Sequence, residues 1–319
     1  MKIIFFGLGS IGRRHARLLM EDTDHELYAF RTMKGQLKGP TGITEVTRMA
    51  QVDKICPDIA FITNPTFLHV KTALLCAKKG IHLFIEKPLS HSMNGVDELI
   101  SITRKKRLVA YVGFNLRFHP VLKEMRKALR GKTVVYSHTT VTSYLPNWRK
   151  GQDYRKSYSA DARKGGGIML DLFHELDYNQ WLFGDIRNIG GRYGKVSGLE
   201  IDAEDHADLL LEFKGSTIGT IHMNWYSHHE QRKVVAYCPG RTYHADLVGN
   251  TLSTYLDGRL EGEVQLPIQK DYTYRAQLKS FLGLVRRKDT RSNNLVGSRQ
   301  LLEALMRFKS VGGKMKVKR

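Results

Sequence analysis

The sequence predicts an α/β protein that begins with a doubly wound parallel sheet and continues into a second α/β domain with an open, mostly antiparallel sheet. A glycine-rich turn follows the first short apolar run and leads directly into a helical pattern. Strand-like and helix-like segments then alternate with short connections, as they do in parallel sheets with helical crossovers. From residue 119 onward, β-rich runs separated by turn signals dominate instead. These observations predict two domains, residues 1–118 and 119–319.

The first predicted strand, residues 2–6, ends at a Gly-x-Gly-x-x-Gly motif that opens a helix. Dinucleotide-binding Rossmann folds use this order of strand, glycines and helix. Gly7 allows a tight turn, Gly9 lets the backbone approach a pyrophosphate, and Gly12 lets the helix pack closely on the strand. Free N–H groups at the start of the helix attract phosphate. We therefore expect the cofactor to contact Gly7, Gly9, Ser10, Ile11 and Gly12.

The second predicted strand, residues 25–30, ends in Phe30-Arg31-Thr32. In NAD sites an acidic residue usually ends this strand and binds the ribose 2′-hydroxyl, but no carboxylate is present here. Arg31 suits a 2′-phosphate, and Thr32 offers a hydroxyl donor. The sequence therefore favours NADP over NAD as the cofactor. The alternative is that Arg31 stacks on the adenine without selecting either cofactor.

Further buried strands are expected at residues 58–63, 81–85 and 108–113, with helices at 66–79 and 93–106. Ligands of such sheets bind beyond the carboxyl ends of the strands. Glu86-Lys87-Pro88 stands at such an end, where Lys87 would exchange a proton with a substrate oxygen during hydride transfer. Glu86 would tether the ammonium group or lie along the cofactor. The alternative is a surface lysine that is held by a turn.

The second half is expected to contain helices at residues 119–130, 168–183, 272–287 and 296–311 and several antiparallel or mixed strands. Between them, residues 143–164 mix aromatic and basic side chains, among them Tyr144, Trp148 and Arg149. This mixture suits an acidic ligand with a ring, such as a carboxylated or nucleotide-linked sugar. The alternative is an exposed loop with ordinary charges.

The composition excludes several classes of protein. Of the 319 residues 41% are hydrophobic, unlike a disordered chain, and no apolar run approaches the ~20 residues that cross a bilayer. Three cysteines without a CxxC pair favour reduced thiols and a cytoplasmic protein. Although there are 13 histidines, no set of His, Asp or Glu has zinc spacing, so no metal site is predicted.

The charge is strongly basic, with 51 Lys and Arg against 31 Asp and Glu and a net charge of +20. Three interpretations compete: attraction of an acidic small molecule, binding to nucleic acid or anionic lipid, and a solvated surface without a specific partner. The basic residues are scattered, and no helix-turn-helix, zinc-finger or RNP signature occurs. Nucleic acid is therefore an unlikely partner.

Five motifs occur in order: GLGSIG at residues 7–12, NPTFLH at 64–69, EKP at 86–88, GFNLRFHP at 113–120 and GGGIMLDLFHELD at 165–177. Together they resemble the glucose-fructose oxidoreductase / inositol dehydrogenase / MocA (Gfo/Idh/MocA) family over nearly the whole chain. The resemblance implies a Rossmann domain, residues 1–118, and a substrate-binding and oligomerisation domain, residues 119–319. It also implies a homodimer or homotetramer.

The resemblance also implies roles for individual residues. Lys87 would be catalytic and contact both substrate and nicotinamide, and Asn115, Arg117 and Phe118 would line the junction of the domains. His174 would be the second acid–base group and Asp171 would orient it or the substrate, although the two lie three positions apart in the sequence where the family usually has four. Asp177 is a reserve candidate. The remaining expected cofactor contacts are Asn64, Pro65, Thr66, His69, Glu86 and Asn115.

The combined expectation is an NAD(P)-dependent oxidoreductase that transfers a hydride between nicotinamide and a hydroxyl or ketone carbon of a sugar. The sugar would be acidic or nucleotide-linked. Two alternatives from other classes remain at this point: a non-catalytic NAD(P)-binding sensor or scaffold, and a basic nucleic-acid-associated protein.

Overall fold

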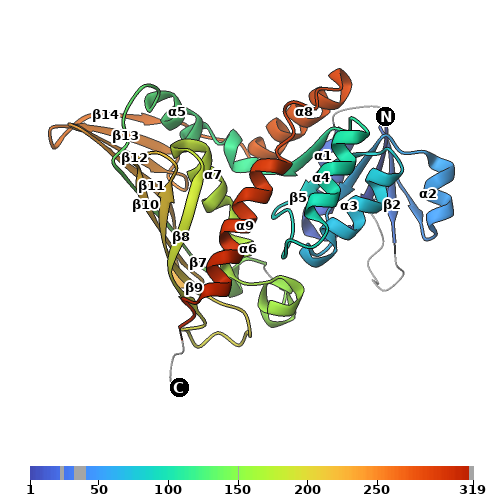
Figure 1. Ribbon diagram of the computed structural model, residues 1–319, viewed down its shortest axis with the longest axis horizontal. Coiled ribbons are helices and arrows are strands. Elements are labelled where there is room, and N and C mark those ends of the chain that lie inside the picture. Colours follow the sequence, from blue (N-terminus) through green and yellow to red (C-terminus); the bar gives the residue numbers. More distant parts are fainter. Residues whose placement is uncertain (22–24, 32–40, 150, 316–319) are drawn as a thin grey trace. The chain divides into compact units, whose positions relative to one another are not determined.

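A computed structural model describes residues 1–21, 25–31, 41–149 and 151–315 (Figure 1). The chain divides into two compact units. The first unit joins Met1–Phe114 with Tyr274–Leu302, and the second joins Asn115–Thr273 with the residues from Glu303 onward. The two predicted domains are contiguous and meet after residue 118. In the structure, the first unit also contains residues 274–302 from near the end of the chain.

Six parallel strands form the sheet of the first unit, in the order β3-β2-β1-β4-β5-β6. Dinucleotide-binding Rossmann folds have this strand order, so the predicted doubly wound parallel sheet is confirmed. The central strand β4 is buried along its whole length, and its neighbours β1 and β5 are buried except at their first residue, as expected of a parallel sheet that helices cover on both faces. The strands are β1 (Lys2–Phe6), β2 (Glu26–Phe30), β3 (Ile43–Val46), β4 (Ile59–Ile62), β5 (His82–Glu86) and β6 (Ala110–Gly113).

Helices connect these strands, and Figure 1 shows α3 and α4 beside each other, with α3 packed on β4 and β5. The sequence does not predict β3 or the helix α2 that follows it, because β3 has only four residues and its two central residues are exposed. The helices are α1 (Ser10–Glu21), α2 (Met49–Ile55), α3 (His69–Lys78), α4 (Val96–Lys105) and most of α8 (Tyr272–Arg287).

A stack of aromatic rings explains why α8 belongs to the first unit. Phe61 stacks on Phe5 at 5.0 Å and on Phe84 at 4.7 Å between ring centroids. Phe281 of α8 meets the rings of Phe61 and Phe84 edge-on at 5.9 and 5.3 Å. Since burying one such ring stabilises the fold by about 1.5–3 kcal/mol, this helix completes the core of the parallel sheet.

Two asparagines after α8 cover the edge of this sheet. Asn293 accepts a hydrogen bond from the backbone N–H of Ala110 at 2.9 Å and donates to the carbonyl of Leu108 at 2.9 Å. Asn294 does the same with the N–H and carbonyl of Val112, at 2.7 and 3.0 Å. Two side-chain amides therefore satisfy the outer backbone groups of β6, which would otherwise form an open edge.

Eight strands form the sheet of the second unit, in the order β14-β13-β12-β11-β7-β10-β9-β8. All neighbouring pairs are antiparallel except β7 and β10, so the expected mostly antiparallel sheet is confirmed. The strands are β7 (Tyr136–Tyr144), β8 (Ile186–Gly194), β9 (His206–Phe213), β10 (Ile218–Asn224), β11 (Tyr226–Cys238), β12 (Arg241–Asp246), β13 (Thr251–Leu256) and β14 (Arg259–Gln265).

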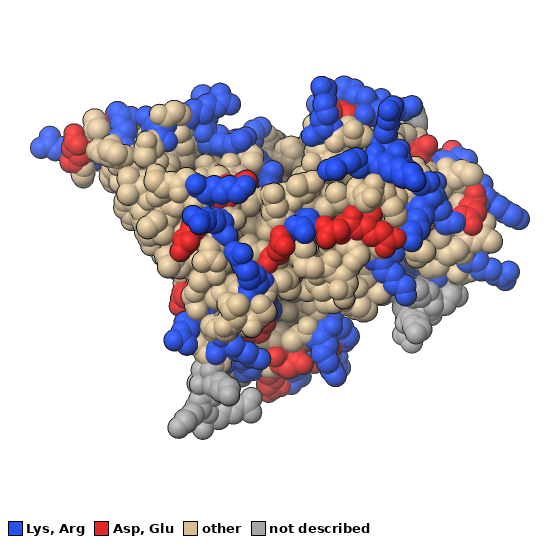
Figure 2. All heavy atoms as spheres, viewed as in Figure 1, with Lys and Arg blue, Asp and Glu red and all other residues tan. Residues whose placement is uncertain are grey.

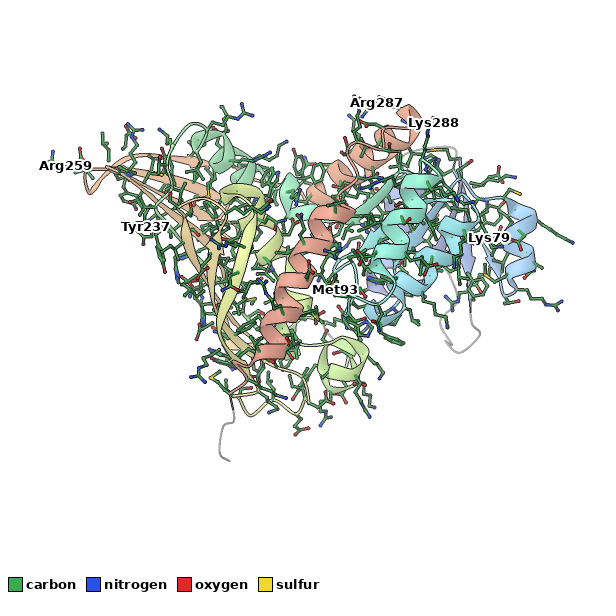
Figure 3. All side chains as sticks on the ribbon, viewed as in Figure 1. Lys79, Met93, Tyr237, Arg259, Arg287 and Lys288 are labelled. Carbon is green, nitrogen blue, oxygen red and sulfur yellow. The ribbon has the colours of Figure 1, made fainter. Side chains whose placement is uncertain are left out.

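The two faces of this sheet differ. Helices α5 (Pro120–Ala128) and α7 (Phe173–Phe183) cover one face, where apolar side chains of both helices and of β11, β12 and β13 form a core (Figure 1). We call the opposite face the outer face. In Figure 3 the labelled Tyr237 of β11 lies on this outer face, and it is 42% exposed. Strand β9 alternates buried and exposed side chains along its length, as expected of a sheet with one open face.

The helix predicted at residues 168–183 is interrupted. Leu172 adopts φ −96° and ψ 34°, which separates a short α6 (Ile168–Asp171) from α7. The prediction of one continuous helix is therefore wrong at this residue. Residues 145–164 form four short 3₁₀ turns, η3 to η6 (Leu145–Asn147, Tyr154–Lys156, Tyr158–Ala160 and Ala162–Lys164). The helices predicted at the end of the chain are confirmed by α8 and α9 (Leu295–Val311).

Lys and Arg side chains are scattered over the face seen in Figure 2, with carboxylates between them. Many of the exposed cations pair with a nearby carboxylate, as Lys214 does with Asp185 at 2.7 Å and Arg241 with Glu261 at 2.8 Å. Among the residues that the structure describes, no helix is long and apolar enough to cross a membrane.

Candidate active site

The glycine loop between β1 and α1 leaves room for a ligand at one position. A Cβ on Gly7, whose φ is 108°, would lie 2.6 Å from the backbone nitrogen of Asn64. A Cβ on Gly12 would lie 2.2 Å from the carbonyl oxygen of Gly7. In contrast, no protein atom lies within 4 Å of a Cβ placed on Gly9. Packing therefore requires the first and third glycines, while the second leaves the open space that a pyrophosphate needs at the helix start, where Ser10 and Ile11 begin α1.

The loop after β4 lies directly against this glycine loop. The Thr63 hydroxyl donates to the carbonyl of Gly7 at 2.6 Å, and Asn64 donates to the hydroxyl of Thr72 at 2.9 Å. Pro65 precedes the 3₁₀ turn η1 (Thr66–Leu68), and Thr66 is buried. The predicted residues 64–66 therefore lie next to the glycine loop, and Thr63, which the sequence analysis did not select, joins the two.

His69 connects two strand ends rather than pointing into open space. It is 2% exposed, and its ring nitrogens lie 2.9 Å from the carbonyl oxygens of Pro88 and Asn64. Burial lowers the pKa of His69, although both carbonyls act in the opposite direction. A neutral ring donates to only one carbonyl at a time. His69 therefore holds the loop after β4 close to the loop that contains Lys87.

Glu86, at the carboxyl end of β5, is held from two sides. Its Oε1 lies 2.7 Å from Nε2 of His15, and its Oε2 accepts a hydrogen bond from the backbone N–H of Lys87 at 3.2 Å. His15 is fully buried on α1, and its ring contacts those of Phe84 and Tyr274. Lys87 itself is half-buried. The carboxylate therefore fixes the backbone that carries Lys87.

No sequence motif points to His15. It lies three residues after Gly12, in the buried stripe of α1 with Ala16, Leu18 and Leu19. A single polar residue in an apolar stripe is a weak signal, because buried histidines in helices are often structural. Only the distance to Glu86 distinguishes His15 from an ordinary core histidine.

Arg31 stands directly after β2, where the adenosine ribose of a dinucleotide would lie. Its backbone N–H donates to the carbonyl of Val46 at 2.8 Å, and its side-chain Nε lies 3.8 Å from Oε1 of Glu45 on β3. The guanidinium therefore has a carboxylate beside it. Thr32, the second residue proposed for this position, lies outside the described residues.

In the second unit the structure brings two side chains from the segment before α6, Arg149 and Tyr158, together with Asp171 of α6. The Tyr158 hydroxyl donates to Oδ1 of Asp171 at 2.6 Å, and the guanidinium of Arg149 lies 5.7 Å from the centre of the Tyr158 ring. Burial, and then the Asp171 carboxylate, hold the pKa of Tyr158 well above its usual value. Tyr158 therefore keeps its proton near neutral pH and orients the carboxylate of Asp171.

The glycine triplet before α6 fixes this arrangement. A Cβ on Gly166 would lie 2.3 Å from the carbonyl oxygen of Tyr158, and Gly167 has φ 113° with a Cβ position 2.5 Å from the carboxyl carbon of Glu204. The N–H of Gly167 donates to the carbonyl of Ser159 at 3.1 Å. The triplet therefore lets α6 start directly against the backbone that carries Tyr158.

The other predicted residues of α7 and η2 (Asn115–Phe118) have different surroundings. Arg117 binds both oxygens of Asp177, at 2.8 and 2.6 Å, and Asp177 is 2% exposed. Burial raises the pKa of Asp177 and Arg117 opposes the shift. Asp177, the reserve candidate for catalysis, thus forms a buried ion pair with Arg117. His174 is half-buried on the first turn of α7, and Asn115 donates to the hydroxyl of Thr273 at 2.8 Å.

A cavity of about 340 Å³ lies within the segment that follows β7. Trp148 and Arg149, both predicted to bind substrate, contribute to its lining with Tyr154 and Lys156. Tyr144, the third aromatic or basic residue predicted there, instead stacks on His228 with ring centroids 3.9 Å apart. The cavity thus joins aromatic surface with two cationic side chains, which suits an anionic ligand with a ring.

Comparison with known families identifies both halves of the chain. Residues 1–114 match the family described as "Oxidoreductase family, NAD-binding Rossmann fold", and residues 125–243 match the "GFO/IDH/MocA C-terminal domain". The first match covers the six-stranded sheet, and the second covers much of the eight-stranded sheet.

Named relatives and solved structures agree with this result. The chain is 28% identical to myo-inositol 2-dehydrogenase of Thermotoga maritima over 69% of this chain and 67% of that protein. It is 24% identical to UDP-N-acetylglucosamine 3-dehydrogenase of Acidithiobacillus ferrooxidans over 81% of this chain and 78% of that protein. The fold matches the WlbA dehydrogenase of Bordetella pertussis, solved with NADH and UDP-GlcNAcA, with a TM-score of 0.79 and 15% identity over 97% and 95% of the two chains.

The glycine loop, the strand order and the family matches lead to one conclusion. The chain belongs to the Gfo/Idh/MocA family of NAD(P)-dependent oxidoreductases, as its motifs indicate.

Proposed function

We propose that the protein transfers a hydride between a nicotinamide dinucleotide and a hydroxyl or ketone carbon of a sugar, and that this sugar is acidic or nucleotide-linked. The observation that carries the proposal is the placement of Lys87 at the carboxyl end of β5, directly after a Glu86 side chain that His15 holds at 2.7 Å. The name of the UDP-N-acetylglucosamine 3-dehydrogenase supports a nucleotide-linked sugar, whereas that of the myo-inositol 2-dehydrogenase supports only oxidation at a hydroxyl carbon, since inositol is neutral.

In this proposal a bound dinucleotide would supply the hydride acceptor or donor. Its phosphates would lie on the N-terminus of α1 against Gly9, where a side chain is absent and the backbone is accessible. Lys87 would hydrogen-bond the reacting oxygen of the substrate and exchange the proton that accompanies hydride transfer. Glu86 acts through the backbone of Lys87 and is a positioning residue.

The second unit would supply the remaining polar groups of the reaction. His174 would act as the second acid–base group, and Asp171 would bind a substrate hydroxyl or orient His174. The Tyr158 hydroxyl donates to Oδ1 of Asp171 and so restricts the rotation of this carboxylate. A carboxylate with restricted rotation would contribute to catalysis by positioning the substrate.

The substrate would be recognised by the segment between β7 and α6. Arg149 and Lys156 offer two positive charges on the lining of the cavity, and Trp148 offers a flat apolar surface. An anionic sugar or a sugar linked to a nucleotide has both features that these groups recognise. Asp153 also lines the cavity, and its carboxylate would repel a ligand whose negative charge lies beside it.

For the cofactor we propose a preference for NADP over NAD that is moderate rather than absolute. Arg31 is placed to bind a 2′-phosphate, but Glu45 beside it offers the carboxylate that a ribose 2′-hydroxyl would prefer. A guanidinium and a carboxylate at the same position favour tolerance of both cofactors.

We further propose that the protein is a homodimer or homotetramer of the cytoplasm. The outer face of the eight-stranded sheet exposes Leu210, Ile218 and Tyr237, which are 44%, 48% and 42% exposed. A second copy would cover this apolar surface. The three cysteines are free, as expected in a reducing compartment.

The experiment that tests the function is a screen of initial rates with UDP-linked amino sugars, UDP-linked uronic acids, inositols and neutral monosaccharides, each with NAD and NADP. We expect turnover with an anionic or nucleotide-linked sugar and a loss of kcat/KM of roughly tenfold or more in Arg149→Ala. The matched control is Arg163→Ala, whose side chain is fully exposed in the same segment. Exclusive turnover of neutral sugars, with Arg149→Ala unaffected, would contradict the substrate class.

A further inference from the structure

Three side chains on the outer face of the eight-stranded sheet bring metal-binding atoms together. His206 and Asp208 lie two residues apart on β9, and His222 on β10 is the direct register partner of Asp208. Nε2 of His206 lies 2.9 Å from Oδ2 of Asp208, and Nδ1 of His222 lies 2.6 Å from Oδ1. One ligand atom from each residue lies within 4.8 Å of the others. The sequence analysis missed this group because strand pairing, not chain spacing, assembles it.

The surroundings of the two imidazoles are those of metal ligands. The ring nitrogen of His206 that faces away from Asp208 lies 2.9 Å from the Tyr226 hydroxyl, and that of His222 lies 2.9 Å from the Asn224 amide. Partners of this kind fix the ring orientation of metal-binding histidines. Both rings are therefore already turned with one nitrogen toward the shared carboxylate.

The group also has a charge and an opening that suit a cation. Asp208 is the acidic member of the group, and one nitrogen of each imidazole faces its carboxylate. The Asp208 side chain is 57% exposed, and His222 is partly exposed. In a single chain, solvent therefore reaches the carboxylate and can complete a coordination shell with water.

We propose that His206, Asp208 and His222 bind one divalent transition-metal ion, with Zn²⁺ as the expected ion. Two imidazole nitrogens and one carboxylate oxygen are a common ligand set for Zn²⁺, Co²⁺ and Ni²⁺, whereas Mg²⁺ and Ca²⁺ favour oxygen ligands alone. The ion would link β9 to β10 on the outer face. It would play no part in hydride transfer, so the proposal is independent of the function proposed above.

The hydrogen bonds around the group define what binding requires. Without an ion, each imidazole N–H donates to Asp208; with an ion, the proton must move to the opposite ring nitrogen. The Tyr226 hydroxyl can accept a hydrogen bond from the Nδ1–H of His206, because a hydroxyl both donates and accepts. For His222, the atom that faces Nε2 is the amide nitrogen Nδ2 of Asn224, which donates and cannot accept. The amide oxygen Oδ1 of Asn224 already accepts a hydrogen bond from the N–H of Ser227 at 3.1 Å. Asn224 must therefore rotate its amide, which weakens binding.

This requirement gives an unusual test, since one substitution should strengthen the site. Asn224→Asp places a carboxylate where it accepts from Ser227 and His222 together. We expect it to tighten Zn²⁺ binding by roughly tenfold, the lower end of the effect of outer ligand partners on metal affinity. His222→Ala and Asp208→Asn should weaken binding by roughly 100-fold or more. His244→Ala is the matched control, because His244 is an exposed histidine of the same sheet on β12 and packs on Tyr255.

The measurement is a titration of the full-length, chelator-treated oligomer without an affinity tag, with Zn²⁺ in competition with a chromophoric chelator and with Co²⁺ followed by its visible absorption. One ion per chain, lost in His222→Ala and tighter in Asn224→Asp, is the expected result. Far-UV circular dichroism confirms that each variant is folded. Absence of binding in the wild type at micromolar Zn²⁺, or equal affinities in wild type, His222→Ala and Asn224→Asp, would overturn the proposal.

Discussion

His15 and Glu86 meet in the interior of the Rossmann unit, with 2.7 Å between Nε2 and Oε1. The first residue belongs to the helix that follows the glycine loop, and the second ends the strand that leads into Lys87. One buried contact therefore connects the two loops that the family motifs mark as cofactor-binding and catalytic. We infer that this contact sets the position of Lys87 relative to the start of α1.

Replacement of His15 should affect turnover more than cofactor affinity. In His15→Ala the buried Glu86 carboxylate loses its partner, which destabilises the fold by about 1–3 kcal/mol. The displaced loop should lower kcat by roughly tenfold to 100-fold, while the dissociation constant of the dinucleotide changes little. His15→Gln, which keeps a side-chain donor, should recover part of kcat. An equal loss of kcat in both variants would show that the ring, and not the hydrogen bond, matters.

Tyr158 should matter through Asp171. Tyr158→Phe removes the hydroxyl that donates to Oδ1 of Asp171 at 2.6 Å. We expect kcat/KM to fall by about tenfold, the equivalent of one charge-assisted hydrogen bond. Tyr28→Phe is the control, because the Tyr28 hydroxyl also donates to a carboxylate, that of Glu26 at 2.7 Å, at an exposed position of the first unit. Similar values of kcat/KM in the two variants would show that Tyr158 does not act on the reaction through Asp171.

Cofactor preference should depend on Arg31 and Glu45 in opposite directions. Arg31→Asp should weaken NADPH relative to NADH by on the order of tenfold or more, since a charged partner of the 2′-phosphate is replaced by a like charge. Glu45→Gln should shift the preference toward NADPH, because the guanidinium loses the carboxylate 3.8 Å away. Fluorescence titration with both reduced cofactors measures each ratio. Unchanged ratios of NADPH to NADH affinity in both variants would show that the adenosine ribose does not bind beside Arg31 and Glu45.

The Arg117–Asp177 pair makes a pH-dependent contribution to stability. Burial raises the pKa of Asp177 while Arg117 opposes the shift, so the folded state holds the Asp177 proton more tightly than the unfolded state does. The contribution of this carboxyl is therefore greatest below its unfolded pKa and declines as the pH rises through the folded pKa. Arg117→Leu removes the opposing charge and should raise the folded pKa further.

We therefore expect Arg117→Leu to destabilise the protein by about 3–5 kcal/mol near neutral pH. The loss should be smaller at roughly pH 5, because the unpaired Asp177 carboxyl is more fully protonated there. Urea denaturation at both pH values measures the difference. The double variant Arg117→Leu/Asp177→Leu should recover much of the loss at neutral pH. A loss that is the same at both pH values in Arg117→Leu would mean that Asp177 stays ionised after its partner is removed.

The sequence was most informative where backbone geometry restricts residue choice. Gly7 and Gly12 contact backbone atoms so closely that no side chain fits, and the strand–glycine–helix order is visible in the letters alone. The β-rich runs of the second half, separated by turn signals, are equally visible. These features predict both sheets correctly, because hydrophobic period and turn chemistry act over a few neighbouring residues.

Contacts between distant segments were not accessible in this way. Asn293 and Asn294 pair with the edge of β6, more than 180 residues earlier, and nothing in their own neighbourhood indicates it. The same holds for Phe281, which completes the core of the first unit. The interruption of the helix at Leu172 was missed because Leu is a strong helix former and the break is imposed by the surrounding fold.

The central claim is that Lys87 is the group that exchanges a proton with the substrate. Its most direct test is the turnover of Lys87→Met with the substrate identified by the screen, beside dinucleotide binding measured on the same preparation. The account predicts that kcat falls by roughly 100-fold or more while the dissociation constant of the dinucleotide stays within about threefold of wild type. Turnover equal to that of the wild-type protein would contradict it.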